Sequence, residues 1–196
     1  MLRLLAGELP PAGTRLGAGP IDAPLLASAA RETSWQPAEG WPVPRVGNRE
    51  MESRGEVAPE VEVWRAVHDP SCDLEQVLAR REGGPLIAQG RYRTLETWTE
   101  SELSAVHALG RIVGSGRAEW SDRLDRARRW HLEHTQPDNA TNRPWALHVF
   151  ILAADVESGL YAQTLLHNAQ VAGPTLEPLA RVIMLDAAHE LERAAR

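Results

Sequence analysis

The sequence predicts an all-α protein of antiparallel α-hairpins, arranged as a bundle or a partial α/α-toroid-like arc, with an irregular N-terminal arm. Two observations predict this fold. Residues 59–196 carry the apolar periodicity of helices, with only short breaks between the periodic segments, which is typical of antiparallel neighbours. Residues 1–58 are too rich in proline and glycine for long regular elements. We therefore expect an arm (1–58) packed on a helical domain (59–196), with no convincing sequence repeat that would indicate a solenoid.

Within the arm, one short helix fits after Asp22, with Pro24 in its first turn. The segment 35–44 is expected to be extended, because residues that precede proline avoid the helical region. Its two tryptophans, Trp35 and Trp41, favour packing of the arm on the body, since large apolar rings in water are unfavourable. Disorder is the alternative for the first twenty residues.

The body opens with two short helices. The first is expected over 59–68, although the alternation of Val61 and Val63 leaves a strand open. The second is expected over 73–81, where Asp73 and Gln76 resemble a capping box and two glycines follow as a stop signal.

Longer helices follow. Thr99 and Glu102 form a better capping box, which predicts a helix from this point to Gly114. The next helix is expected over 118–135 and a further one over 144–155, with Pro144 in its first turn. The latter is apolar nearly all round and is therefore expected to be buried. Two more helices are predicted over 157–171 and 176–194, separated by a Gly-Pro break.

Composition excludes several function classes. The formal net charge is −6, and the richest arginine stretch, 117–143, is nearly neutral because acidic residues are interspersed. Nucleic-acid binding needs clustered cations, so it is not expected. No apolar stretch approaches the eighteen or so residues of a membrane-spanning helix, so no membrane association is expected. The chain contains no lysine, which removes Schiff-base and P-loop lysine chemistry.

Cysteine usage and motifs limit the chemistry further. Cys72 is the only cysteine, so no internal disulfide can form, and the N-terminal apolar run is too short for a secretory signal. We expect a cytoplasmic protein. The chain has no Walker, GxGxxG, GxSxG or zinc-finger spacing, so no cofactor is predicted.

The densest side-chain chemistry lies between Trp130 and Trp145. On a helix, His131 and His134 fall on the same side as Leu124 and Ala127, so both imidazoles are expected to face the core or a cleft. Two such imidazoles are candidate catalytic acid/base groups. No metal site is predicted, because no HExxH or comparable ligand set is present. The alternative is that both histidines pack and hydrogen-bond as ordinary structural residues.

The loop after this helix supplies candidate ligand-binding groups. A carboxylate, an amide and a guanidinium between two indole rings suit a sugar or a carboxylated ligand. The candidate ligand-binding residues are Trp130, Asp138, Asn139, Arg143, Trp145 and His148. Local structure offers a competing explanation, in which Pro-Asp-Asn forms a turn and Asn142 caps the next helix.

Three functional hypotheses follow. The leading one is a soluble, non-catalytic helical interaction or scaffold domain that binds a protein partner or forms a homo-oligomer. The alternative is a protein or enzyme that binds a small polar ligand, a carbohydrate or carboxylate, with its site in the 130–148 helix-loop-helix. The third is a histidine-based metal protein. The sequence leaves open whether the chain is an enzyme.

Overall fold

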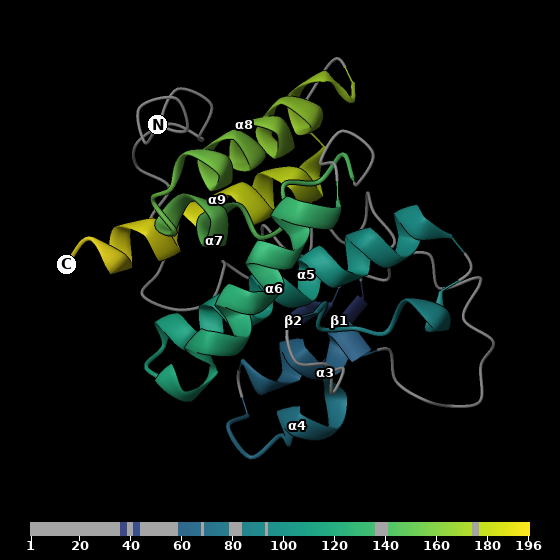
Figure 1. Ribbon diagram of the computed structural model, residues 1–196, viewed down its shortest axis with the longest axis vertical. Helices are drawn as coiled ribbons and strands as arrows, with labels where there is room; N and C mark the ends of the chain where they lie inside the picture. The colour runs from purple at the N-terminus through teal and green to yellow at the C-terminus, as the bar shows by residue number, and fades with distance from the viewer. Residues whose placement is uncertain are drawn as a thin grey trace.

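The architecture is all-α, with one short β-hairpin (Figure 1). It is described by a computed structural model for residues 36–38, 41–43, 59–67, 69–78, 84–92, 94–135, 141–173 and 177–196. Strand β1 (Gln36–Ala38) pairs antiparallel with β2 (Trp41–Val43), so the segment 35–44 is extended where it is described. The helix predicted after Asp22 lies outside the described residues. Packing of the arm on the body stays a prediction, as does the pairing of the helices into antiparallel hairpins.

The rest of the described chain contains nine helical elements, joined by loops. The α-helices in chain order are α3 (Pro59–Ala66), α4 (Leu74–Val77), α5 (Leu95–Gly114), α6 (Ser121–His134), α7 (Leu147–Leu152), α8 (Val156–Val171) and α9 (Pro178–Ala194). Two short 3-10 helices, η1 (Gln89–Arg91) and η2 (Ala118–Trp120), precede α5 and α6. No helix among the described residues is long and apolar enough to cross a membrane.

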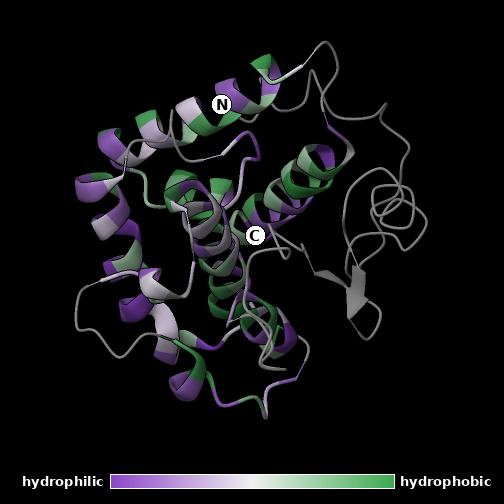
Figure 2. Cartoon of the chain, turned by 90° about the vertical axis from the view of Figure 1, so that its right-hand side faces the viewer, coloured by the Kyte–Doolittle hydropathy of each residue, from purple (hydrophilic) through white to green (hydrophobic). Residues whose placement is uncertain are grey.

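Helix α5 is the centre of this arrangement. It contacts α3, α6, α7 and α9 (Figure 1), and every residue from 101 to 110 is buried. Hydrophobic residues are concentrated on the helices in the interior of the molecule (Figure 2). Because a helix buried on all sides has no solvated face, the polar side chains of α5 must find partners inside the protein.

The start of α5 corrects one sequence prediction. The helix begins at Leu95, where the Thr94 hydroxyl accepts a hydrogen bond from the Thr97 backbone N–H at 3.2 Å. Thr99 lies inside the helix and donates to the Leu95 carbonyl at 2.8 Å, so the predicted capping box at Thr99 and Glu102 is wrong. Thr94 and Thr99 are both acceptable N-caps in sequence.

Glu102 instead holds the loop that leads into α5. Its carboxylate is fully buried and accepts hydrogen bonds from the backbone N–H groups of Leu86 and Ile87, both at 2.6 Å. From α6, the Arg123 guanidinium donates to the carbonyls of Gly84 and Pro85 at 2.9 and 2.6 Å. These bonds satisfy backbone groups that burial has removed from water, so the loop is fixed between α5 and α6.

The remaining boundaries differ from prediction by a few residues. The helix predicted over 73–81 is observed only as α4, and residues 79–83 lie outside the described chain. Helix α7 begins three residues after Pro144, because Ala146 adopts a left-handed backbone conformation with φ of 58°. As predicted, residues 147–150 of α7 are buried, but Leu152 is 47% exposed.

Candidate functional site: a cavity against helix α5

The three predicted site residues on α6 do not share one environment. His131 is fully buried, and the Thr135 hydroxyl lies 3.0 Å from its Nδ1. His134 is exposed, donates from Nδ1 to the Trp130 carbonyl at 3.0 Å and stacks on the Trp130 ring. The expectation that both imidazoles face inward therefore holds for His131 alone. His134 is the last residue of α6, and its ring stacks on the indole of Trp130, one turn earlier in the helix.

Arg143 and Trp145 are engaged in contacts that hold the chain together. The Arg143 guanidinium binds the Glu177 carboxylate through two hydrogen bonds of 3.0 Å and donates to Glu100 of α5 at 2.6 Å. The Trp145 ring is buried and donates to the same Glu100 carboxylate at 3.4 Å. Asp138 and Asn139 lie outside the described residues. These contacts explain Arg143 and Trp145 as tethers between the 141–146 segment, α5 and the residue that precedes α9.

His107 of α5 was not singled out from the sequence, yet it connects three helices. Its Nδ1 accepts a hydrogen bond from the Ala146 backbone N–H at 3.1 Å, so the ring proton lies on Nε2. Nε2 then donates to Asp186 of α9 at 2.7 Å, and Arg111 donates to the other Asp186 oxygen at 2.8 Å. Burial opposes ionisation of Asp186, but these donors outweigh it and lower the pKa of its carboxyl.

The sequence did contain a signal for this connection. His107 follows Val106 on the apolar stripe of α5, and Asp186 follows Ile183 on the apolar stripe of α9. Ionisable residues inside two apolar stripes indicate a buried pair, because neither group is stable in the core without a partner. Only the fold, however, tells which histidine meets which carboxylate.

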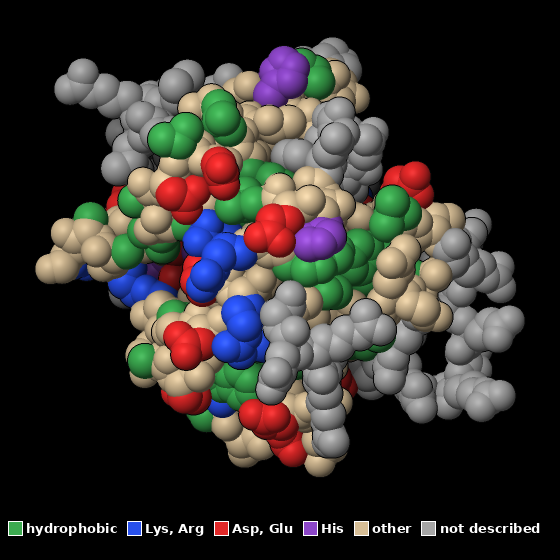
Figure 3. All heavy atoms as spheres, in the orientation of Figure 1, with side chains coloured by type: hydrophobic (Ala, Val, Ile, Leu, Met, Phe, Trp, Pro, Cys, Tyr) green, Lys and Arg blue, Asp and Glu red, His purple; other side chains and the backbone are tan. Residues whose placement is uncertain are grey.

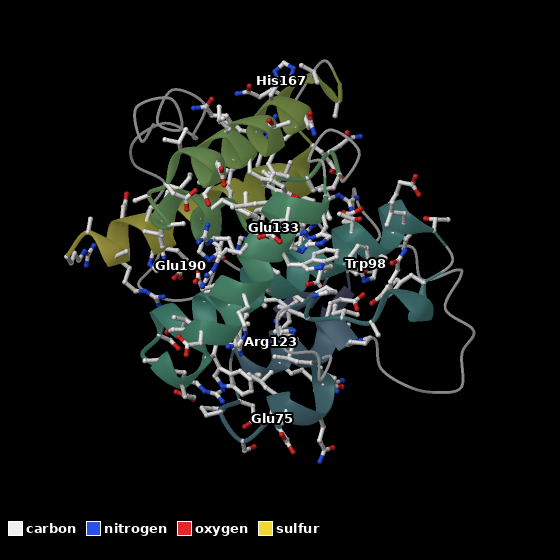
Figure 4. All side chains as sticks on the ribbon, viewed as in Figure 1. Glu75, Trp98, Arg123, Glu133, His167 and Glu190 are labelled. Carbon is white, nitrogen blue, oxygen red and sulfur yellow. The ribbon has the colours of Figure 1, made fainter. Side chains whose placement is uncertain are left out.

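A cavity of about 360 Å³ lies between α5, α6, α7 and α9. Among the predicted site residues that the structure describes, His148 alone lines it. The lining residues are Gly110, Val113, Gly114, Ser121, Leu124, Asp125, Arg128, His148, Val149, Leu152, Ala153, Glu190, Arg193 and Ala194. Glu190, which belongs to this lining, is labelled on α9 in Figure 4.

Two buried polar groups in the cavity wall have unused hydrogen-bonding capacity. His148 is 1% exposed, and neither ring nitrogen has a hydrogen-bond partner among the described residues. Burial holds the pKa of His148 well below its usual range, so the imidazole is neutral. Glu190 is 3% exposed, and its Oε1 likewise has no hydrogen-bond donor in the described chain. Unsatisfied buried groups of this kind are uncommon and mark candidate sites.

The charged groups of the wall are paired with one another. Arg193 binds the second oxygen of Glu190. Arg128 binds Asp125 at 2.7 Å and also Asp155 at 2.8 Å. Arginine and carboxylate side chains lie side by side near the middle of the face drawn in Figure 3. The wall thus combines apolar side chains with charged groups that neutralise one another.

Two glycines one turn apart on α5 make room for these groups. A Cβ atom at Gly110 would lie 2.6 Å from His148 Nε2 and 2.5 Å from a Val149 methyl carbon. A Cβ atom at Gly114 would lie 3.1 Å from Glu190 Oε2 and closer still to the Arg193 guanidinium. Glycine inside a helix costs up to about 1 kcal/mol relative to alanine. At these positions it permits α7 and α9 to approach α5 closely.

Among the described residues, no three His, Cys, Asp or Glu side chains are grouped as a metal site would require. Comparison with models of protein families, with curated proteins and with solved structures finds no match to this chain.

Gly110 lies against α7, whereas Gly159 on α8 faces open space, so alanine should have opposite effects at the two positions. Gly110→Ala should destabilise the protein by about 1–2 kcal/mol, because the clash with buried α7 side chains exceeds the gain in helix propensity. In Gly159→Ala on α8 the added Cβ atom has no neighbour within 4 Å, so this substitution should stabilise the protein by about 0.5–1 kcal/mol. Urea unfolding of both variants measures the two effects. Equal stabilisation by both substitutions would contradict the packing described at Gly110.

Proposed function

We propose that this protein is a non-catalytic binding protein and that a small molecule occupies the cavity between α5, α6, α7 and α9. One observation carries the proposal: the cavity wall contains two buried polar side chains, His148 and Glu190, with hydrogen-bonding atoms that the described residues do not use. The volume supports it as well, because small-molecule sites typically enclose roughly 300–1,000 Å³ and combine apolar walls with a few polar groups.

The histidines of α5 and α6 are not placed to act as general bases in this cavity. The His107–Asp186 pair has the geometry of a base and its orienting carboxylate, but both ring nitrogens of His107 are engaged and the ring is 1% exposed. A general base needs a free nitrogen within reach of a substrate. His131 is fully buried beside Thr135, and His134 stacks on Trp130 away from the cavity.

The carbohydrate or carboxylate site expected over 130–148 receives less support. Arg143 is bound to two carboxylates, Glu100 and Glu177, and Trp145 is buried. A ligand would have to displace contacts that tie the 141–146 segment to α5. The α5 cavity requires no such rearrangement, and we propose it as the binding site.

The proposal is tested by closing the cavity. Ala153→Trp places an indole in the cavity wall, and Ala172→Trp adds the same ring at an exposed position outside it. A diverse fragment library is screened by thermal shift and ligand-observed NMR against the wild type and both variants. We expect fragments that bind the wild type and Ala172→Trp but not Ala153→Trp. At one hundred times Kd such a fragment raises stability by about 2.7 kcal/mol.

Ser121→Trp fills the cavity from α6 and gives an independent test if Ala153→Trp folds poorly. Circular dichroism and a cooperative thermal transition establish that each variant is folded. The absence of any hit in the library, or hits that bind the filled variants as tightly as the wild type, would refute a binding site in this cavity.

A second function, association through α8, is favoured by a specific surface feature. Val156 and Leu160 lie four residues apart on α8 and are 79% and 58% exposed, and Val171 at its end is 62% exposed. Apolar side chains at this spacing form one helix face. The leading hypothesis from the sequence, an interaction or scaffold domain, fits a homo-oligomer that buries this face.

Light scattering after size-exclusion chromatography tests the association. The wild type should form a dimer or larger species at high concentration, and Val156→Glu combined with Leu160→Glu should be monomeric, because two charges cannot be buried unpaired. Gln76→Glu with Gln89→Glu adds the same charge at exposed positions outside α8, on α4 and η1, and should leave association unchanged. A monomeric wild type at every concentration would exclude self-association through this face.

A further inference from the structure

Two chemically different sets of side chains line the cavity. One set is apolar and comes from three helices, α5, α6 and α7: Val113, Leu124, Val149, Leu152 and Ala153, the last directly after α7. The other set is Asp125, Arg128, Glu190 and Arg193, and His148 lies on α7 beside Gly110. A ligand that fills such a space has an apolar body and a polar head group, because only then do both sets meet a matching surface.

The charges of the charged set cancel. The two arginines, Arg128 and Arg193, face the two carboxylates Asp125 and Glu190, and each arginine forms an ion pair within the wall. A charged ligand would have to break one of these pairs or remain without a counter-charge in a desolvated space. Burying an unpaired charge is costly, so the wall selects against ligands of either sign.

The pKa shifts of Glu190 and His148 agree with this preference for an uncharged ligand. Burial raises the pKa of Glu190, which reflects the cost of negative charge at its position. Burial lowers the pKa of His148, with His107, Arg111 and Arg193 adding to the shift, which reflects the cost of positive charge beside α5. An additional anion near Glu190 and an additional cation near His148 are thus both disfavoured.

The unused hydrogen-bonding atoms define the head group. Glu190 Oε1 has no hydrogen-bond donor among the described residues; Arg111 Nε and His189 Nδ1 each lie 3.7 Å away, beyond hydrogen-bonding distance. A carboxylate oxygen can only accept, so it requires a donor from the ligand. His148 Nε2 and Glu190 Oε2 lie against Gly110 and Gly114, which are separated by one helical turn of about 5.4 Å. The two side chains therefore lie within about one helical turn of each other along α5, and both line the cavity.

We propose that the ligand of this cavity is an uncharged molecule with an apolar body and a hydroxyl or amide N–H that donates to Glu190, with His148 as its second hydrogen-bond partner. This inference rests on the proposed function, since it assigns a ligand class to the same cavity. The sequence offered, as an alternative, a carbohydrate or carboxylate ligand at the 130–148 helix-loop-helix; the ligand proposed here is a neutral hydrogen-bond donor in the cavity against α5.

Four probes that share one apolar body test the ligand class: 4-methylphenol, toluene, 4-methylbenzoate and 4-methylbenzylammonium. Their dissociation constants are measured by calorimetry and NMR titration on the full chain. We expect 4-methylphenol to bind about tenfold or more tightly than each of the other three, because it alone adds a hydrogen bond without a charge.

Glu190→Gln should weaken 4-methylphenol binding about tenfold and leave toluene binding unchanged, because a neutral amide is a weaker acceptor than a carboxylate. Glu192→Gln, at an exposed position of the same helix, is the matched control and should bind all probes as the wild type does. The ranking of the four probes on the wild type decides the proposal even if Glu190→Gln fails to fold.

The possible results separate the two proposals. Toluene binding as tightly as 4-methylphenol, or tightest binding by either ion, overturns the ligand class while the cavity remains a binding site. The same holds if Glu190→Gln folds but binds 4-methylphenol with unchanged affinity. Binding of all four probes that persists in Ala153→Trp counts against the cavity as the site, and absence of binding by every probe counts against both proposals.

Discussion

The fold depends on one buried imidazole. His107 accepts a hydrogen bond from the Ala146 backbone and donates to Asp186, so a single side chain of α5 fixes the start of α7 and the middle of α9. Both ring nitrogens of His107 form hydrogen bonds, and Arg111 donates to the second carboxylate oxygen of Asp186. In a desolvated interior such bonds are strong, and the loss of one partner leaves a buried polar group without compensation. Three of the four helices that enclose the cavity are thereby held in one arrangement.

The hydrogen bond between Ala146 and His107 also helps to place His148 beside the cavity. The left-handed conformation of Ala146 delays the start of α7, and that conformation is unfavourable for a residue with a Cβ atom. The hydrogen bond from its N–H to His107 compensates for part of this cost. Two residues later, His148 then lies against Gly110, where the absence of a side chain on α5 leaves room for its ring. Backbone strain, a glycine and a buried histidine thus form one connected feature beside the cavity.

Much of the fold could be predicted from the sequence. The all-α class follows from apolar periodicity, and the buried character of α7 follows from a segment without a polar face. Boundaries were less predictable, because Thr94 and Thr99 are both plausible caps and the choice depends on where Glu102 finds its partners. The site could not be located in this way. Sequence proximity grouped Trp130, His131, Arg143 and Trp145, whereas tertiary contacts engage Arg143 and Trp145 as structural ties and leave His148 in the cavity wall.

The central claim, that His107 connects α5 to α7 and α9, is tested most directly by the ring nitrogen-15 chemical shifts of His107 in uniformly labelled protein. We expect a single neutral tautomer with the proton on Nε2, and an Nε2–H that exchanges slowly with water because it is buried against Asp186. A proton on Nδ1, or shifts that average between tautomers with fast exchange, would contradict it, since Nδ1 could not then accept the hydrogen bond from Ala146.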